Sequence, residues 1–228
     1  LLSSFIEPSV LSKITHTIES DLIKKMTDFF YLASQSPRRR EILDKLHAPY
    51  RLLNLIEGPG RDADFEETQI PGEMPVDYVK RISTTKADAA WKHLSDNQLQ
   101  AAPILTADTT VCINDTILGK PNDAQEARLM LEILSGKEHQ VLTAINMKNG
   151  DNVQQKLSKT TVSMRQITTN EIEAYIKTDE PFGKAGSYGI QGIASIFISH
   201  IAGTYSGVVG LPIYETSDLM KHFGFSLL

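Results

Sequence analysis

Apolar residues follow two kinds of spacing along the chain: short continuous runs and helical stripes. Continuous runs bounded by turn residues predict buried strands, whereas apolar residues repeating every three or four positions predict amphipathic helices. Strands are expected at residues 29–32, 50–55, 103–107, 110–114, 116–118, 139–146, 156–167 and 194–200. Helices are expected from Pro37, from Pro75, from Asn122 or Asp123, and over residues 171–176 and 212–223. Crossovers mixed with hairpins predict an α/β fold built on a mixed β-sheet.

Turn-forming residues separate these elements. Asn114-Asp115 is typical of a tight hairpin turn, and Asn149-Gly150 lies between two predicted strands. Ser135-Gly136 and Gly224 follow predicted helices, where residues that end a helix are expected. Residues 56–74 are acidic and contain glycine and proline, so we expect them to form a loop over a cleft.

The first 25 residues differ from the rest of the chain. Their apolar residues are spaced to line one face of an amphipathic helix. These residues are Val10, Leu11, Ile14, Ile18 and Leu22. Met26 directly precedes the first predicted strand. We therefore expect either that Met26 is the natural start, or that residues 1–25 form an extension appended to a folded domain at residues 26–228.

The composition limits the classes of function. Hydrophobic residues make up 41% of the 228 residues and charged residues 22%, as in globular proteins. The formal net charge of −5 argues against a nucleic-acid partner. The single cysteine, Cys112, excludes an internal disulfide and lies in an apolar run, so it is expected in the core. The sequence shows no secretory-signal pattern and no apolar stretch of transmembrane length. We therefore expect a cytoplasmic protein with no membrane partner.

The turn between the first predicted strand and helix carries the densest set of functional candidates. Ser36 is a good N-cap, Pro37 suits the first helical position, and Arg38, Arg39 and Arg40 follow. Free backbone N–H groups at a helix start attract anions, and arginine adds forked donors that fit phosphate oxygens. These residues predict a phosphate site. Taken alone, they are explained equally well by a solvated basic patch at a helix end.

A carboxylate and two lysines are further candidates for this site. Asp108 closes the apolar strand 103–107 and is followed by Thr109, and ligands bind at strand ends in α/β sheets. Lys120 ends the hairpin that begins beside Asp108, and Lys86 lies near the apolar face of a predicted helix. Each residue also has an ordinary explanation. Asp108 could be a turn aspartate bonded to nearby amides, and Lys120 and Lys86 could be exposed lysines in water.

Residues 182–192 form a second dense segment with four glycines. Glycine allows the backbone to approach a ligand closely, Lys184 offers charge, and Gln191 can both donate to and accept from a base edge. The spacing does not match a Walker A loop, and a flexible loop is the simpler alternative. With the other candidates, the cations fit a polyphosphate and the carboxylates fit Mg²⁺ or Mn²⁺. The residues therefore predict metal-assisted chemistry on a nucleoside polyphosphate.

Seven short blocks between about Tyr31 and Phe223 resemble the Maf family, the septum-formation-inhibitor-like nucleoside triphosphate pyrophosphatases. The blocks are Ser34-x-Ser36-Pro37-Arg38-Arg39; Lys86-Ala87; Ala107-Asp108-Thr109; Leu118-Gly119-Lys120-Pro121; Leu134-Ser135-Gly136 with His139 and Val141; Lys184-Ala185-Gly186-x-Tyr188-Gly189-Ile190-Gln191-Gly192; and Val209-Gly210-Leu211-Pro212. A single block is weak, but seven in the order of the family are specific.

This resemblance implies a two-lobed fold related to the inosine-triphosphate pyrophosphatases. An extended mixed sheet flanked by helices would carry the active site in a central cleft, in a homodimer. The implied enzyme converts a nucleoside triphosphate and water to the monophosphate and pyrophosphate with a divalent cation. The catalytic aspartate of the family, a proton acceptor for water and a metal ligand, matches Asp108. The implied phosphate-binding residues are Ser34, Arg39, Lys86, Lys120 and Lys184.

The resemblance also implies a substrate class. Members of the dTTP/UTP type carry Arg, Thr and Gln at positions that match Arg38, Thr109 and Gln191. The 7-methyl-GTP type carries Asp-Gln and Ser-Glu-Gly instead, which this chain lacks. The amide of Gln191 could pair with a pyrimidine carbonyl and ring N–H together. The implied substrates are dTTP and UTP, with modified pyrimidine nucleotides as further candidates for a house-cleaning role.

The chain departs from the family pattern at one position and offers three matches for another. Gly183 stands where family members usually have an aspartate that could orient the lysine or bind metal. The metal-linked glutamate of the family matches Glu57 best, with Asp62 and Asp64 as alternatives. The alternative function is a nucleotide-binding regulator that arrests cell division through a protein partner rather than by turnover.

Overall fold

Short apolar runs of the sequence form the strands of one mixed sheet. The computed structural model describes residues 27–55 and 68–228. Its strands are β1 (Phe30–Leu32), β2 (Tyr50–Leu52), β3 (Ile104–Ile113), β4 (Thr116–Leu118), β5 (Glu138–Asn149), β6 (Asn152–Met164) and β7 (Ile198–Ala202). The sheet has the order β2-β1-β3-β5-β6-β7, and β4 pairs with β3. β1 runs parallel to β2 and β3, and the other pairs are antiparallel. The predicted α/β fold with a mixed sheet is confirmed.

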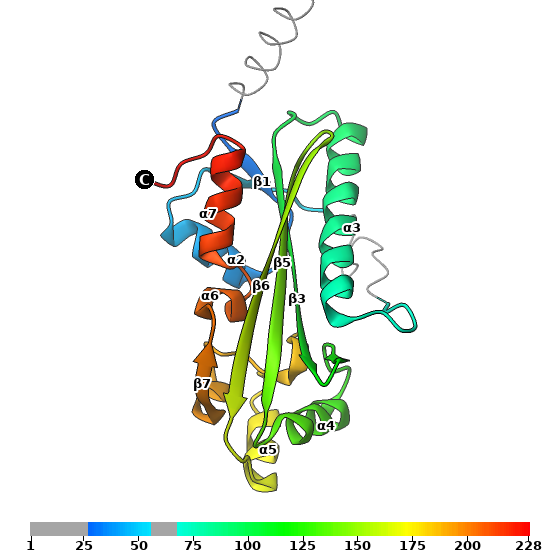
Figure 1. Ribbon diagram of the computed structural model, residues 1–228, viewed down its shortest axis with the longest axis vertical. Coiled ribbons are helices and arrows are strands. Elements are labelled where there is room, and N and C mark those ends of the chain that lie inside the picture. The colour runs from blue at the N-terminus through cyan, green and yellow to red at the C-terminus, as the bar shows by residue number, and fades with distance from the viewer. Residues whose placement is uncertain (1–26, 56–67) are drawn as a thin grey trace, which may run out of the picture.

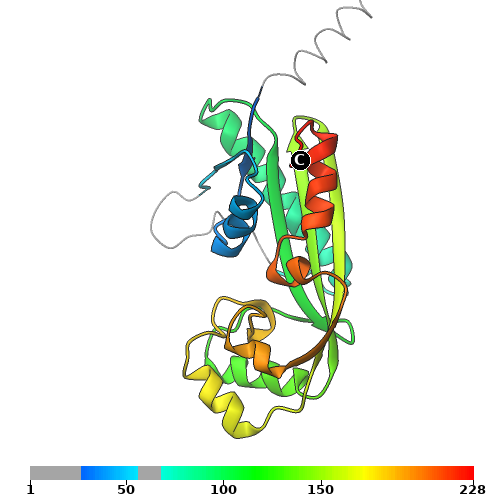
Figure 2. The same ribbon diagram turned by 90° about the vertical axis from the view of Figure 1, so that its left-hand side faces the viewer.

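Helices cover both faces of the long strands (Figures 1 and 2). The helices are α2 (Pro37–Lys45), α3 (Pro75–Asp96), α4 (Ala124–Leu134), α5 (Thr169–Ile176), α6 (Tyr205–Val209) and α7 (Ile213–His222), with short 3-10 helices η1 (Ala185–Ser187) and η2 (Ile193–Phe197). Side chains alternate between the faces of a strand. Accordingly, Ile104 of β3 packs with Leu94 of α3, whereas Leu105 packs with Leu219 of α7.

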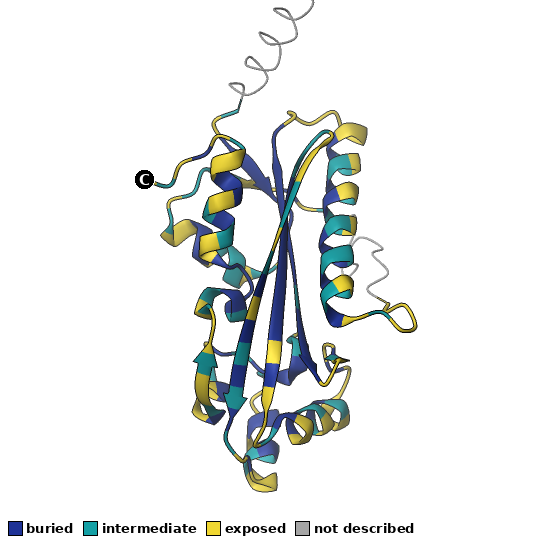
Figure 3. Cartoon of the chain, in the orientation of Figure 1, coloured by how far each residue is buried: buried dark blue, intermediate teal, exposed yellow. Residues whose placement is uncertain are grey.

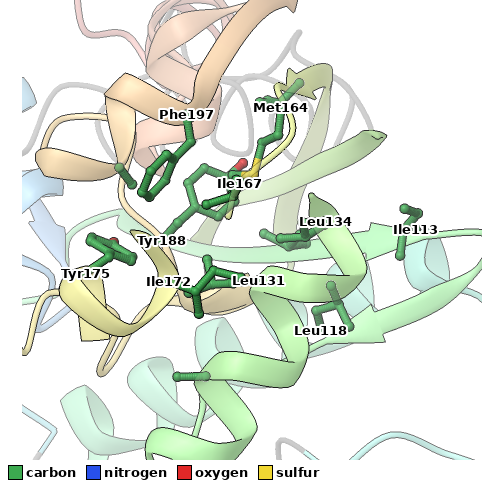
Figure 4. Close-up of a cluster of buried hydrophobic side chains, with 14 of the residues drawn as sticks. Ile113, Leu118, Leu131, Leu134, Met164, Ile167, Ile172, Tyr175, Tyr188 and Phe197 are labelled. Atoms are coloured by element: carbon green, nitrogen blue, oxygen red, sulfur yellow. The ribbon is translucent and has the colours of Figure 1, made fainter. Parts of the chain in front are cut away.

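The core is divided into clusters along the strands, which are buried over much of their length (Figure 3). One cluster lies at the end of the sheet covered by α4 and α5, where the Tyr175 and Phe197 rings meet edge to face with centroids 5.5 Å apart (Figure 4). A second lies toward the other end, where Phe30 and Ile145 pack with α2 and α7. Residues 108–110 of β3 therefore lie between two packed ends of the molecule.

Turn and cap residues explain two of the element boundaries, and two strands differ from their predicted bounds. The hairpin at Asn114-Asp115 is confirmed, with φ angles of 47° and 62°, which these two residue types tolerate. Asp123 is the N-cap of α4 and accepts a hydrogen bond from the Glu126 N–H, which decides between the two predicted caps. The strand expected at residues 50–55 ends at Leu52. The strand expected from residue 156 begins at Asn152 and ends at Met164.

The strand expected at residues 194–200 is wrong in its first half. Ile193–Phe197 form η2, and β7 begins at Ile198. The alternating pattern is real, but the backbone N–H groups of Ile193 and Ala194 donate to the carboxylate of Glu180. The chain turns there because these donors are bonded to a side chain instead of to a neighbouring strand.

The expected N-terminal helix and Met26 lie outside the described residues. In the described part of the chain, no helix has the length and apolar character needed to cross a membrane.

Candidate active site

The site lies at a notch in the sheet, which is the stretch of β3 at residues 106–110 whose edge facing β1 and β4 has no partner strand among the described residues. β1 pairs with β3 only at Ile104 and Leu105, and β4 pairs with β3 only from Val111 onward. Within residues 27–55 and 68–228, no strand pairs with residues 106–110 on this edge of β3. The Ala33 N–H bonds to the Leu105 carbonyl, so alternation directs the backbone groups of residues 107 and 109 toward the same open edge.

The notch corrects one prediction about Asp108. Asp108 does not end a strand, because β3 runs without a break from Ile104 to Ile113. What ends beside it is the neighbouring strand β1, whose last residue is Leu32. The interpretation that ligands bind where a parallel strand ends still applies, but to β1.

A cavity of about 580 Å³ opens at this notch. Its walls come mainly from the turn at residues 33–39, β3, residues 183–192 and residues 208–210. The lining is completed by Leu53, Leu55, Lys86, Lys120, Val141 and Glu180. The cavity touches every predicted catalytic, specificity and phosphate residue in the described chain. These residues are Ser34, Arg38, Arg39, Lys86, Asp108, Thr109, Lys120, Lys184 and Gln191.

Asp108 and Lys86 line the cavity and form an ion pair. The Lys86 Nζ lies 2.7 Å from Asp108 Oδ1, and both side chains are largely buried. Lys86 comes from α3, on the face of β3 toward which even-numbered residues point. Pairing offsets the cost of burying either charge alone. The site therefore holds a carboxylate and an ammonium group in direct contact beside an open cavity.

Arg39 connects three segments around the cavity. Its Nε donates to the Gly210 carbonyl at 2.8 Å, one terminal nitrogen donates to Ser34 Oγ at 3.0 Å, and the other to Thr109 Oγ1 at 3.3 Å. Thr109 Oγ1 also bonds with Thr143 Oγ1 of β5 at 2.9 Å. The planar guanidinium offers these donors in a fixed fork, which suits three acceptors at set directions. Arg39 thus holds the walls of the cavity together as well as lining it.

The start of α2 faces the cavity as predicted, with a difference in its capping. Ser36 occupies the N-cap position and Pro37 the first turn, but no side-chain capping bond forms. Instead, Ser34 Oγ accepts from the Ser36 N–H at 3.3 Å and from Arg39. The amino end of α2 is therefore not blocked by its N-cap side chain, and Arg38 lines the cavity beside it.

The glycine-rich segment forms the opposite wall. The Gly186 N–H donates to the Gly119 carbonyl at 3.0 Å, which brings Lys184 and Lys120 to the same cavity from distant parts of the sequence. Gly186 has φ of 66°, and an added Cβ would lie 2.9 Å from Val111, so no larger residue fits. The Lys184 Nζ donates to the Glu180 carbonyl. Burial, then the charge of Arg38, lowers the pKa of Lys184 below its usual value.

The remaining candidates are partly outside the described residues. Glu57, Asp62 and Asp64, the three candidates for the metal-linked carboxylate, all lie there. Among described residues, no group of three His, Cys, Asp or Glu side chains could hold a metal ion. Mg²⁺ commonly binds through one or two carboxylates together with substrate phosphates and water. The carboxylate of Asp108, in a cavity lined by cations that suit phosphates, fits such a mode.

Three groups that shape the cavity were not predicted from the sequence. Thr143 bonds to Thr109 and donates to the Gly207 carbonyl at 2.8 Å. Glu180 lines the cavity and contacts the glycine-rich segment. His139 was noted only as part of a block, yet its Nε2 lies 2.7 Å from the hydroxyl of Tyr188, which lines the cavity. A carboxylate two residues before the glycine-rich segment was the available signal for Glu180.

His139 supports the cavity wall as a neutral residue. It is buried, and its Nδ1 has no hydrogen-bond partner among the described residues. Burial lowers the pKa of His139 from 6.5 to about 4, because charging the ring there would cost its hydration. Burial also raises the pKa of Tyr188. The pair is therefore uncharged at neutral pH.

A pH-dependent loss of stability is expected from His139. Between about pH 6.5 and 4 the unfolded chain binds a proton that the folded chain does not, so the free energy of unfolding falls by about 3 kcal/mol. His139→Gln removes this titration, and urea unfolding measured across that range should show a correspondingly smaller loss. His200→Gln, at an exposed position, is the control and should keep the wild-type slope. Equal slopes for all three proteins would contradict the assignment.

Two curated relatives and one solved structure are similar to this chain. The solved structure, of the Staphylococcus aureus Ham1 protein, matches with a TM-score of 0.40 and 17% identity. It covers 62% of this chain and 72% of that chain, and the match is too weak to bear on fold or function. A dTTP/UTP pyrophosphatase of Nitrosomonas europaea is 48% identical over 197 residues, covering 86% of this chain and 95% of that protein. A dTTP/UTP pyrophosphatase of Cupriavidus metallidurans is 49% identical over 199 residues, covering 87% of this chain and 98% of that protein.

A family match covers the same region. Residues 29–223 match the family described as Maf-like protein. The match takes in both packed ends of the sheet and every described residue that the blocks predicted for the cavity. The chain therefore belongs to the Maf-like protein family.

Proposed function

We propose that this protein hydrolyses dTTP and UTP to the nucleoside monophosphate and pyrophosphate. The relatives named above carry the name dTTP/UTP pyrophosphatase. The observation that carries the proposal is the Lys86–Asp108 pair in a cavity lined by further cations. A carboxylate can accept a proton, and several cations can neutralise a polyphosphate, within one site.

In the proposed reaction, water is added across the α–β phosphoanhydride bond. Asp108 accepts a proton from the attacking water. The Lys86 Nζ contacts Asp108 Oδ1 at 2.7 Å. The other carboxylate oxygen, Oδ2, is assigned to the water. The bridging oxygen leaves with the pyrophosphate, so that nucleoside triphosphate and water give monophosphate and pyrophosphate. Lys86 holds the carboxylate in place and adds positive charge near the phosphates.

The cations and the amino end of α2 bind the phosphates in this proposal. Free N–H groups at a helix start and arginine forks are suited to phosphate oxygens. The residues assigned to the phosphates are Ser34, Arg39, Lys86, Lys120 and Lys184. Asp108, together with Glu57 or one of the alternatives Asp62 and Asp64, would hold Mg²⁺ or Mn²⁺. Such an ion neutralises phosphate charge during hydrolysis.

Gln191 is assigned to the base, with Arg38 and Thr109 completing the specificity set. Gln191 lines the cavity and is exposed to it, so its amide is available to a ligand. An amide offers a donor and an acceptor side by side, as the pyrimidine edge of uracil or thymine requires. A cavity of about 580 Å³ has the usual size of a small-molecule site.

Gln191→Glu should weaken the selectivity for uracil and thymine bases. The carboxylate keeps an acceptor but loses the N–H donors, so one hydrogen bond to a base carbonyl is replaced by repulsion. We expect the ratio of kcat/KM for UTP to that for CTP to fall about tenfold or more. Steady-state pyrophosphate release with both nucleotides measures it, and Gln154→Glu in β6 is the control. An unchanged ratio would contradict the assigned role of Gln191.

The proposed function is tested by pyrophosphate release from a nucleotide panel with Mg²⁺ or Mn²⁺. The panel contains dTTP, UTP, CTP, dCTP, GTP, 7-methyl-GTP and ITP. Release from dTTP and UTP alone supports the proposal. Release from 7-methyl-GTP or ITP would keep the reaction but overturn the substrate class. Tight nucleotide binding without turnover would favour the nucleotide-binding regulator instead.

A further inference from the structure

The carboxylate of Glu180 lies against the end of the glycine-rich wall of the cavity. Its Oε2 accepts from the Ile193 N–H at 2.8 Å, and its Oε1 accepts from the Ala194 N–H at 3.3 Å. The Tyr175 hydroxyl donates to Oε1 at 3.0 Å. The two backbone donors form the start of η2, two residues after Gln191, whereas Tyr175 belongs to α5. Both carboxylate oxygens are therefore bonded to the backbone that follows the proposed base-binding side chain.

Gly192 shows how closely this carboxylate approaches. A Cβ added at Gly192 would lie 2.3 Å from Glu180 Oε1 and 2.4 Å from Oε2, far inside van der Waals contact. The carboxylate therefore occupies the space that a side chain at Gly192 would need, although the φ of Gly192, −104°, is one that any residue adopts. The residue directly after Gln191 is packed against the carboxylate.

Glu180 also reaches the other end of the same wall through its backbone. Its carbonyl accepts a hydrogen bond from the Lys184 Nζ. The side chain of Lys184 in turn passes close to Gly189, where an added Cβ would lie 3.0 Å from the lysine Cδ and Cε. Glu180 therefore contacts the glycine-rich segment at two places. Its carbonyl contacts Lys184, which is assigned to the phosphates, and its carboxylate contacts Ile193 and Ala194, which follow the base-binding Gln191.

We propose that Glu180 is a positioning residue for nucleotide selectivity, which sets the place of Gln191 by fixing the backbone from Gly192 to Ala194. The inference rests on the proposed function, because it assigns Gln191 to the base. Glu180 needs no contact with the substrate for this role. Its effect passes through the backbone at Gly192 and through Lys184.

The chemistry of the contacts requires a carboxylate. Both oxygens accept from backbone N–H groups. In glutamine, one of these positions becomes an NH₂ group that faces an N–H donor and cannot accept from it. Glu180→Gln therefore keeps the size of the side chain and breaks one of the two backbone contacts, whichever way the amide turns.

The test compares Glu180→Gln with wild type and with the control Glu132→Gln, which lies at an exposed position of α4. The readouts are kcat and KM for UTP and GTP, and thermal unfolding. We expect the UTP-to-GTP ratio of kcat/KM to fall at least about tenfold in Glu180→Gln, mainly through a higher KM for UTP, with kcat within about threefold. Glu132→Gln should match wild type. A ratio unchanged in a folded Glu180→Gln variant, or an equal loss of kcat for both nucleotides, would overturn the inference.

Two further measurements separate this inference from the proposed function. If wild type prefers another nucleotide, the proposed substrate is wrong, and the same ratio taken for the preferred nucleotide tests Glu180. If wild type shows no turnover, the ratio of equilibrium dissociation constants for α,β-methylene-UTP and α,β-methylene-GTP replaces the kinetic ratio.

A second variant tests the inference if Glu180→Gln does not fold. Gly192→Ala displaces the same carboxylate from the other side and should lower the ratio similarly. A folded Gly192→Ala protein with wild-type selectivity would overturn the inference.

Discussion

Asp108→Asn is expected to lower kcat by about 10³-fold while the protein stays folded. Asparagine has nearly the same shape, and its carbonyl oxygen can still accept the hydrogen bond from Lys86 that the carboxylate accepts at 2.7 Å. What it lacks is the basic oxygen that takes the proton from water. Pyrophosphate release from UTP measures the loss, and thermal unfolding measures the fold.

The control for this change is Asp151→Asn, at an exposed position in the turn between β5 and β6. It alters the same charge far from the cavity and should leave kcat unchanged. Because a lost metal ligand would also lower activity, nucleotide binding without metal is measured for both variants. Turnover of Asp108→Asn within about tenfold of wild type would contradict the role of Asp108 as proton acceptor.

Arg39→Lys is expected to affect both stability and activity although the charge is kept. The guanidinium donates to the Gly210 carbonyl, to Ser34 and to Thr109 along three directions, which one ammonium group on a flexible stem cannot reproduce. We expect the free energy of unfolding to fall by about 2 to 3 kcal/mol, as for two lost hydrogen bonds with partly buried acceptors. We also expect kcat/KM to fall roughly 10²-fold, because the cavity walls lose their fixed positions.

Arg40→Lys is the matched control for this second prediction. Arg40 is the next residue of α2 and lies outside the cavity lining. Urea unfolding and steady-state kinetics with UTP measure both variants. If Arg39 served only as a charge for phosphate, Arg39→Lys would keep its stability and lose little activity, as Arg40→Lys should.

Local chemistry explains the parts of the fold that could be predicted. Asn114 and Asp115 tolerate positive φ, so their hairpin depends on two adjacent residues alone. Asp123 and Thr168 cap their helices through bonds to residues three positions ahead. Residues 194–197 were wrongly predicted as a strand, because the backbone N–H groups of Ile193 and Ala194 bond to Glu180, which is 13 and 14 residues away. The alternating pattern carries no information about such a partner.

The residues of the candidate site could be predicted from the sequence, but their arrangement could not. Its members were named from motif blocks, and the structure brings the described ones to a single cavity. The notch could not be predicted, because it depends on where β1 and β4 stop along β3. The interpretation of Asp108 as a strand-end residue was wrong because β3 continues to Ile113. A run of apolar residues indicates that a strand is buried, but not which of its neighbours is missing.

The sequence by itself determined the α/β class, the hairpin at Asn114-Asp115 and the residue types that could bind a polyphosphate. These depend on periodicity, turn preferences and side-chain chemistry, which act within a few residues. Only the tertiary structure decided that Arg39 holds three cavity segments and that Glu180 holds the wall beside Gln191. Hydrogen bonds between segments up to 171 residues apart depend on the direction of each donor in the folded chain, and no local pattern contains that direction.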